Sequence, residues 1–129
     1  MIFDNDNFEE ISNILNRMDI ETCDFGHTIN KSKEGDFIFV DPPYTVKHNL
    51  NEFIKYNEKI FSWEDQIRLS NCIAKAVTRG ASALILNTDH HSVWKLYKCV
   101  GRMFAVKRAS VISGNSNARG MYTELAIKC

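Results

Sequence analysis

A short apolar run, Phe37–Val40, leads directly into Asp41-Pro42-Pro43-Tyr44, and this junction restricts the fold more than any other stretch. Four large apolar residues in succession predict a buried strand. Proline has no backbone N–H and cannot extend a central strand, so two in succession end the strand abruptly. Both prolines of the 129-residue chain stand here. We therefore expect a strand that stops at a rigid turn, where the Asp41 carboxylate and the proline carbonyls remain as hydrogen-bond acceptors.

This turn has the chemistry to bind an amino group carried on a flat ring. A fixed row of acceptors suits both hydrogens of an exocyclic amine, and Tyr44 offers an aromatic face for stacking. Adenine has both features. The alternative is a structural turn with no ligand, and the strand before it and the aromatic residue after it favour the binding site.

The turn and the motifs that follow it resemble the Dam-like DNA adenine-N6 methyltransferases, which carry this tetrapeptide at the end of their fourth strand. The later motifs stand in the family's order: Phe53, Tyr56 and Phe61; Ser62-Trp63-Glu64-Asp65-Gln66; Asn87-Thr88-Asp89; Ile112-Ser113-Gly114-Asn115; Arg119; and Glu124-Leu125. The resemblance covers roughly residues 20–127.

The resemblance implies a fold, an activity, a cofactor and a set of site residues. The fold is α/β, part of a Rossmann-like methyltransferase sheet with a C-terminal antiparallel hairpin. The activity is methyl transfer from S-adenosylmethionine to the N6 of an adenine flipped out of DNA. The implied site residues are Asp41, Pro42, Pro43 and Tyr44 for catalysis; Asp24, Phe25 and Asp41 for the cofactor; and Phe53, Tyr56, Asn87, Asp89, Ser113, Asn115 and Arg119 for DNA. For Asp24 and Phe25, a helix cap and a core side chain are an equally good interpretation.

The sequence departs from the family in its glycines. Family members rest the methionine end of the cofactor on a glycine-rich turn after the first strand, but the six glycines here are scattered singly. None forms a G-x-G pair after a strand, as a cofactor-cradling loop requires. The first two strands and the DNA-reading insertion of the family are also missing. We interpret residues 1–129 as one domain that corresponds to the C-terminal catalytic half.

Hydrophobic periodicity predicts the other elements. Helices are expected after a cap at residues 6–9, over residues 63–79 behind a Ser62–Asp65 capping pair, and around residues 93–100. Strands are expected over residues 20–23, 81–86, 102–107 and 122–127, the last two as a hairpin. The expected buried face of the second helix consists of Ile67, Cys72, Ile73, Ala76 and Val77.

Residues 45–60 are polar and are expected to form a loop over the site. Phe53, Tyr56 and Phe61 would close on a flipped base or on cofactor, as lids do when substrate binds. Alternatively, Phe53 and Phe61 pin the loop to the core.

The strand at Phe37–Val40 lacks the neighbour that it has in the complete family sheet. A flat apolar edge would be exposed in a monomer, and native proteins cover or pair such edges. We expect either residues 20–23 or another chain to pair with it. That chain would be a second copy, giving a homodimer, or a separate chain carrying the N-terminal half.

The distribution of charged residues, cysteines and histidines bears on whether the chain binds nucleic acid or metal. The formal net charge is zero, but residues 89–129 hold seven basic and two acidic side chains, a net +5. A basic third suits DNA phosphates, although a solvated face is an equal alternative. Cys72 and Cys99 fall on apolar helix faces, which predicts buried free thiols, and His90-His91 lacks a third metal ligand at a recognisable spacing.

The N-terminal residues 1–6 are acidic, whereas a secretory signal starts basic, and no apolar run approaches the ~20 residues that span a bilayer. We expect a cytoplasmic location. Two alternatives to DNA methylation stay open: methylation of RNA or of a protein glutamine, and an inactive remnant or nucleic-acid-binding module that keeps the fold.

Overall fold

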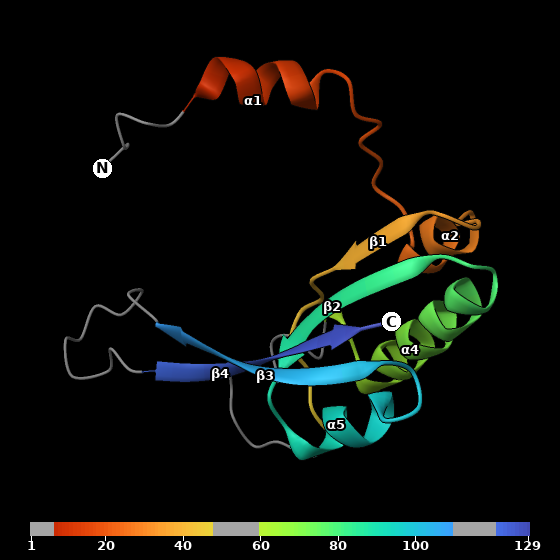
Figure 1. The fold of residues 1–129 in the computed structure, drawn as a ribbon, viewed down its shortest axis with the longest axis vertical. Coiled ribbons are helices and arrows are strands. Elements are labelled where there is room, and N and C mark those ends of the chain that lie inside the picture. The colour runs from red at the N-terminus through yellow and green to blue at the C-terminus, as the bar shows by residue number, and fades with distance from the viewer. Residues whose placement is uncertain (1–6, 48–59, 110–120) are drawn as a thin grey trace.

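The computed structural model describes residues 7–47, 60–109 and 121–129. Its elements are α1 (Phe8–Leu15), α2 (Phe25–Asn30), β1 (Phe37–Val40), α4 (Trp63–Thr78), β2 (Ser82–Thr88), α5 (His91–Tyr97), β3 (Arg102–Ala109) and β4 (Met121–Lys128). The strands form one sheet in the order β1-β2-β4-β3 (Figure 1). β1 and β2 are parallel, and β4 pairs antiparallel with both β2 and β3. The predicted α/β class, a partial methyltransferase-like sheet with a C-terminal hairpin, is confirmed.

Helix α4 joins the two parallel strands and begins at the predicted cap. Ser62 Oγ accepts a hydrogen bond from the Asp65 backbone N–H at 3.1 Å, and the Asp65 carboxylate accepts from the Ser62 backbone N–H at 3.1 Å. The predicted buried face is only partly right, because Ile67 is 39% exposed. The buried residues are Gln66, Leu69, Ser70, Ile73 and Ala76. Two of these are polar, which apolar periodicity cannot reveal.

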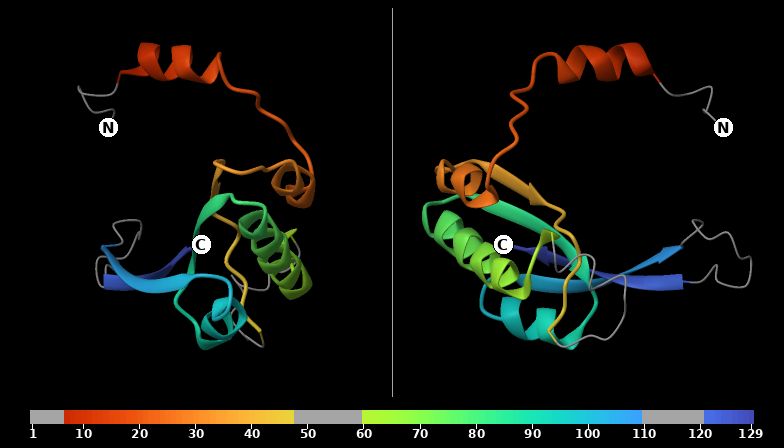
Figure 2. Two further views of the ribbon diagram at one scale, coloured as in Figure 1. Left: turned by 45° about the vertical axis from the view of Figure 1, so that its right-hand side comes forward. Right: turned by 180° about the vertical axis from the view of Figure 1, so that it is seen from behind.

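The helices α2, α4 and α5 lie on one face of the sheet (Figure 2). α4 contacts α2, α5 and β2. Ile85 and Ile127, which pair across β2 and β4, are fully buried beneath the helices together with Ile73. On the other face, Phe37 is 65% exposed and Phe39 is 58% exposed, so the prediction of a buried strand is wrong for these two residues. In the described part of the chain, the sheet is therefore covered on one side only.

Helix α1 lies apart from the sheet (Figure 1). It is capped by Asn7, whose side chain accepts from the Glu10 backbone N–H at 3.1 Å, but none of its residues is buried. The predicted strand at residues 20–23 is wrong: the segment forms no strand, and Ile20 is 75% exposed. The chain turns into α2 there instead, because Asp24 caps that helix and the Cys23 thiol lies 3.1 Å from Thr28 Oγ1.

The start of β1 is held against the end of α4. Arg79 donates to the carbonyl oxygens of Ser32 and Ile29, at 2.9 Å each. Gly80, with a φ of +94°, accepts from the Gly35 backbone N–H at 3.1 Å. A left-handed φ favours glycine. These contacts hold the segment that leads into β1 against the end of α4.

All four cysteines are free. Cys72 is half-buried, but the prediction of a buried thiol at Cys99 is wrong, since that residue is exposed. α5 ends at Tyr97, so Cys99 lies in the turn beyond the helix and not on its apolar face. Within the described ranges, no helix combines the length and the apolar character needed to cross a membrane.

Candidate active site

The Asp-Pro-Pro-Tyr turn lies at the carboxyl end of β1, the edge where open α/β sheets bind ligands. Asp41 and Pro43 are exposed, Pro42 is buried and Tyr44 is half-buried. The chain beyond the turn is anchored. Val46 is 2% exposed, and the Lys47 backbone N–H donates to Ser92 Oγ, at the start of α5, at 3.3 Å. The turn is thus held by β1 on one side and by α5 on the other.

A cavity of about 360 Å³ lies beside the turn. It is lined by Phe25, Thr28, Ile29, Ile38, Phe39, Val40, Asp41, Pro42, Pro43, Phe61 and Leu69. Its walls are mostly apolar, and Asp41 is the one ionisable side chain among these described lining residues. An apolar cavity of this size with a convergent polar group is typical of a small-molecule site.

Two aromatic rings form part of the cavity wall. The ring centroids of Phe25 and Phe61 are 5.8 Å apart, with the planes tilted by 57°. Phe61 is only 7% exposed and belongs to the hydrophobic core. Its position agrees with the alternative in which this residue pins the loop.

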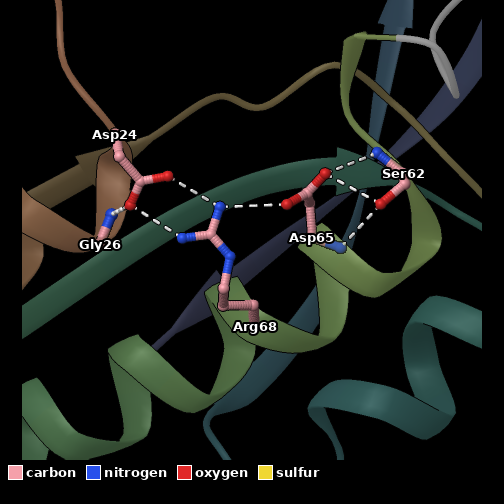
Figure 3. A network of polar contacts seen from close by, with 5 residues as sticks. All are labelled: Asp24, Gly26, Ser62, Asp65 and Arg68. Carbon is pink, nitrogen blue, oxygen red and sulfur yellow. Dashed lines mark hydrogen bonds and ion pairs between the residues drawn. The ribbon is translucent and has the colours of Figure 1, made fainter.

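Asp24, predicted to bind cofactor, acts here as a helix cap (Figure 3). Its carboxylate accepts from the Gly26 backbone N–H at 2.9 Å and from both terminal nitrogens of Arg68, at 2.8 and 2.9 Å. The Arg68 guanidinium holds the pKa of Asp24 below its ordinary value. The cap is thus the observed role of Asp24, whereas contact with cofactor stays a prediction.

Tyr44 interacts with the hairpin strands β3 and β4. Glu124 of β4 accepts from Arg108 of β3 at 2.8 Å. Partial burial raises the pKa of Tyr44 from 10 to about 12, and the negative charges of Glu124 and Asp41 and a hydrogen bond to Glu124 add to this shift. Asp41 thus acts on Tyr44 through its charge, and it also lines the cavity. The sequence did not predict a role for Arg108, and the Glu124-Leu125 motif was the only signal for Glu124.

Other residues predicted to contact DNA have different surroundings. Asn87 is fully buried, and its side-chain oxygen accepts from the Thr88 backbone N–H at 2.9 Å, so it presents no exposed atom to DNA. Asp89 is exposed and accepts from the indole N–H of Trp94 at 2.6 Å. The remaining predicted residues, Phe53, Tyr56, Ser113, Asn115 and Arg119, lie outside the described residues.

His90 caps helix α5. Its Nδ1 accepts from the Ser92 backbone N–H at 3.3 Å. Burial lowers the pKa of His90, and the neighbouring charge of His91 lowers it further. Across residues 7–47, 60–109 and 121–129, no three His, Cys, Asp or Glu side chains are grouped to hold a metal ion.

A sheet of this order, with an acidic turn beside a cavity at its carboxyl edge, defines a methyltransferase-like α/β domain. The sequence profile of the D12 class N6 adenine-specific DNA methyltransferases matches residues 1–111. The chain belongs to this family.

Three characterised proteins are similar to the chain. A type II methyltransferase of Lactococcus lactis subsp. cremoris is 29% identical over 128 residues, which cover 98% of this chain and 45% of that protein. A type II methyltransferase of Methanocaldococcus jannaschii is 28% identical over 123 residues, 94% of this chain and 43% of the relative. A DNA N-6-adenine-methyltransferase of Escherichia phage P1 is 39% identical over 74 residues, 57% of this chain and 10% of the relative. The chain spans less than half the length of each.

Proposed function

We propose that this domain supplies the catalytic turn for methyl transfer from S-adenosylmethionine to the N6 of an adenine flipped out of DNA. One observation carries the proposal: Asp41 lines an apolar cavity, and its charge acts on Tyr44, three residues further along the same turn. A carboxylate in this place can accept a hydrogen bond from an amino group while one ring occupies the cavity and another stacks on Tyr44. The family and the names of the relatives support the same reaction.

The cavity fits the adenine end of the cofactor. Phe25, Phe61 and Ile38 provide apolar walls for a flat ring. Residues 1–129 contain no glycine turn for the methionine end. We propose that this turn comes from polypeptide outside these residues, either more of the same protein or a second chain. When bound, S-adenosylmethionine supplies an electrophilic methyl group.

Asp41 and the Pro42 carbonyl would accept both hydrogens of the adenine amino group. These hydrogen bonds orient the nitrogen lone pair toward the methyl group, and positioned acceptors of this kind are worth ~10²–10³ in rate. As the new N–C bond forms, the bond between the methyl carbon and sulfur would break, leaving S-adenosylhomocysteine, and the nitrogen must lose a proton. Asp41 is exposed and can pass that proton to water. A base in a duplex is inaccessible, so the adenine has to leave the stack first.

Tyr44 would stack on the flipped base. Base–aromatic stacking contributes about 1–3 kcal/mol per base. The contact with Glu124 holds the hydroxyl end of Tyr44, and the ion pair with Arg108 holds Glu124 in turn. β3 also carries exposed cations, Arg102 and Lys107, which suit DNA phosphates. We place this reaction in the cytoplasm.

Isolating a tagged form of the chain from its source cells, with any bound polypeptide retained, tests the proposal. The preparation is incubated with DNA and S-adenosylmethionine carrying a tritiated methyl group, and the digested DNA is separated by chromatography. We expect N6-methyldeoxyadenosine, and a loss of ~10²–10³ in rate for Asp41→Ala. The proposal is refuted if the label enters cytosine, RNA or protein, or if Asp41→Ala methylates adenine at the normal rate.

A further inference from the structure

Arg68 lies at the centre of a polar network that joins α2 to α4 (Figure 3). Its two terminal nitrogens donate to the two carboxylate oxygens of Asp24, at 2.8 and 2.9 Å, and one of them also donates to Asp65 at 3.0 Å. Asp65 is itself held by the cap at Ser62. A planar guanidinium bound in this forked way has a defined orientation.

The same guanidinium lies over the ring of Phe25. The Arg68 Cζ atom is 3.9 Å from the ring centroid, well within the range of a cation–π contact. Phe25 also packs on Phe61, and both rings line the cavity. The Phe25 ring thus contacts both a fixed cation and a core aromatic residue, whereas Arg68 itself does not line the cavity.

The space around this network is tight. A Cβ atom at Gly26 would come within 2.9 Å of Asp24 Oδ1 and 3.3 Å of Arg68 Nη1. The glycine therefore lets α2 approach α4 closely enough for Arg68 to reach both Asp24 and Phe25.

We propose that Arg68 is a positioning residue for the adenine end of S-adenosylmethionine, acting by fixing the Phe25 ring as a wall of the cavity. The proposal rests on the proposed function, because it takes the cavity as the adenine site. The side chains of Arg68 and Asp24 are 44% and 55% exposed. Exposed ion pairs of this kind contribute little to the stability of a fold, because solvent screens them. Loss of Arg68 should therefore alter the cavity wall more than the stability of the fold.

Adenosine is a suitable probe, since it occupies the adenine subsite without needing the methionine contacts. It is titrated into the 129-residue chain while the aromatic resonances of Phe25 are followed by NMR. The variants are Arg68→Lys, which keeps the charge but loses the planar fork, and Arg68→Met, which loses both. Lys75→Met is the matched control, because Lys75 is an exposed cation on the same helix and is absent from the cavity lining.

We expect the wild-type chain to bind adenosine with a millimolar Kd. Both Arg68 variants should bind adenosine about 5- to 10-fold more weakly. A tenfold change corresponds to ~1.4 kcal/mol, which is the size of a cation–π contact. The Phe25 resonances should move in both Arg68 variants, and Lys75→Met should match the wild type. Unchanged adenosine affinity in Arg68→Lys, or an equal loss in Lys75→Met, overturns the proposal. So does a wild-type chain that binds no adenosine. The DNA methylation assay is separate and decides the proposed function by itself.

Discussion

Two copies of this chain should associate through the free edge of β1, the side of the strand that faces away from β2. Phe37 is 65% exposed, and β1 pairs with β2 alone among the described strands. β1 carries no charged residue, whereas the opposite edge strand β3 carries Arg102, Lys107 and Arg108. Charged residues protect an edge strand against pairing with another chain, so β1 is the unprotected edge.

The effect of Phe37→Lys on the dimer dissociation constant can be worked out from the exposed fraction of the Phe37 side chain. Full burial of a phenylalanine side chain stabilises by about 1.5–3 kcal/mol, so burying the exposed two-thirds of Phe37 contributes ~1–2 kcal/mol. A symmetric dimer contains this residue twice, which gives ~2–4 kcal/mol. The dimer dissociation constant should therefore rise by at least ~30-fold.

Sedimentation velocity over a range of micromolar concentrations measures this change. We expect concentration-dependent association of the wild-type chain and a monomer for Phe37→Lys. Phe104→Lys is the matched control, because Phe104 is 45% exposed on the charged edge strand β3. A wild-type chain that stays monomeric at tens of micromolar would contradict the reasoning. Equal weakening by Phe104→Lys would also contradict it, since the effect would then not belong to the β1 edge.

The remaining predictions concern the site and its support. In the methylating complex, Tyr44→Ala should weaken the binding of DNA by about 1–3 kcal/mol when the DNA contains a mismatched, easily flipped adenine. Fluorescence anisotropy measures this binding. Equal binding by the variant and the wild type would exclude stacking on Tyr44. The free energy of unfolding should hold to about pH 10 and then fall between about pH 10 and pH 12, because the ordinary pKa of tyrosine is 10.0, whereas that of Tyr44 is raised to about 12 in the folded chain. Titration of the phenolate absorbance checks this. The difference between the wild-type and Tyr44→Phe curves should show a transition near pH 12, and a transition near pH 10 would contradict the prediction. The 129-residue chain should bind S-adenosylmethionine no better than weakly, and micromolar binding by calorimetry would show that the cofactor site is complete. Ser62→Ala removes the α4 cap and should lower the free energy of unfolding, measured by urea denaturation, by about 1 kcal/mol. Ser82→Ala, at the exposed start of β2, is the control and should change it by less than about 0.5 kcal/mol. Similar losses in both variants would mean that the cap contributes nothing specific.

Features that depend on neighbouring residues could be predicted from the sequence. The strand Phe37–Val40, its abrupt end at Pro42 and the capping pair of Ser62 and Asp65 all lie where periodicity and turn chemistry placed them. Each depends on backbone geometry or hydrogen bonds within a few residues. The candidate turn was found in the same way, because its acceptors and its aromatic residue are adjacent in the chain.

Contacts between distant segments could not be predicted in this way. Arg68 and Asp24 are 44 positions apart, and they meet only because α2 packs on α4. The Tyr44 contact with Glu124 likewise requires β4 to insert between β2 and β3. Residues 20–23 were expected to form a strand, but a strand forms only when a neighbouring strand takes up its backbone hydrogen bonds. Local chemistry therefore determined the elements and the reactive turn, whereas the packing of helices on one face of the sheet decided which side chains surround that turn.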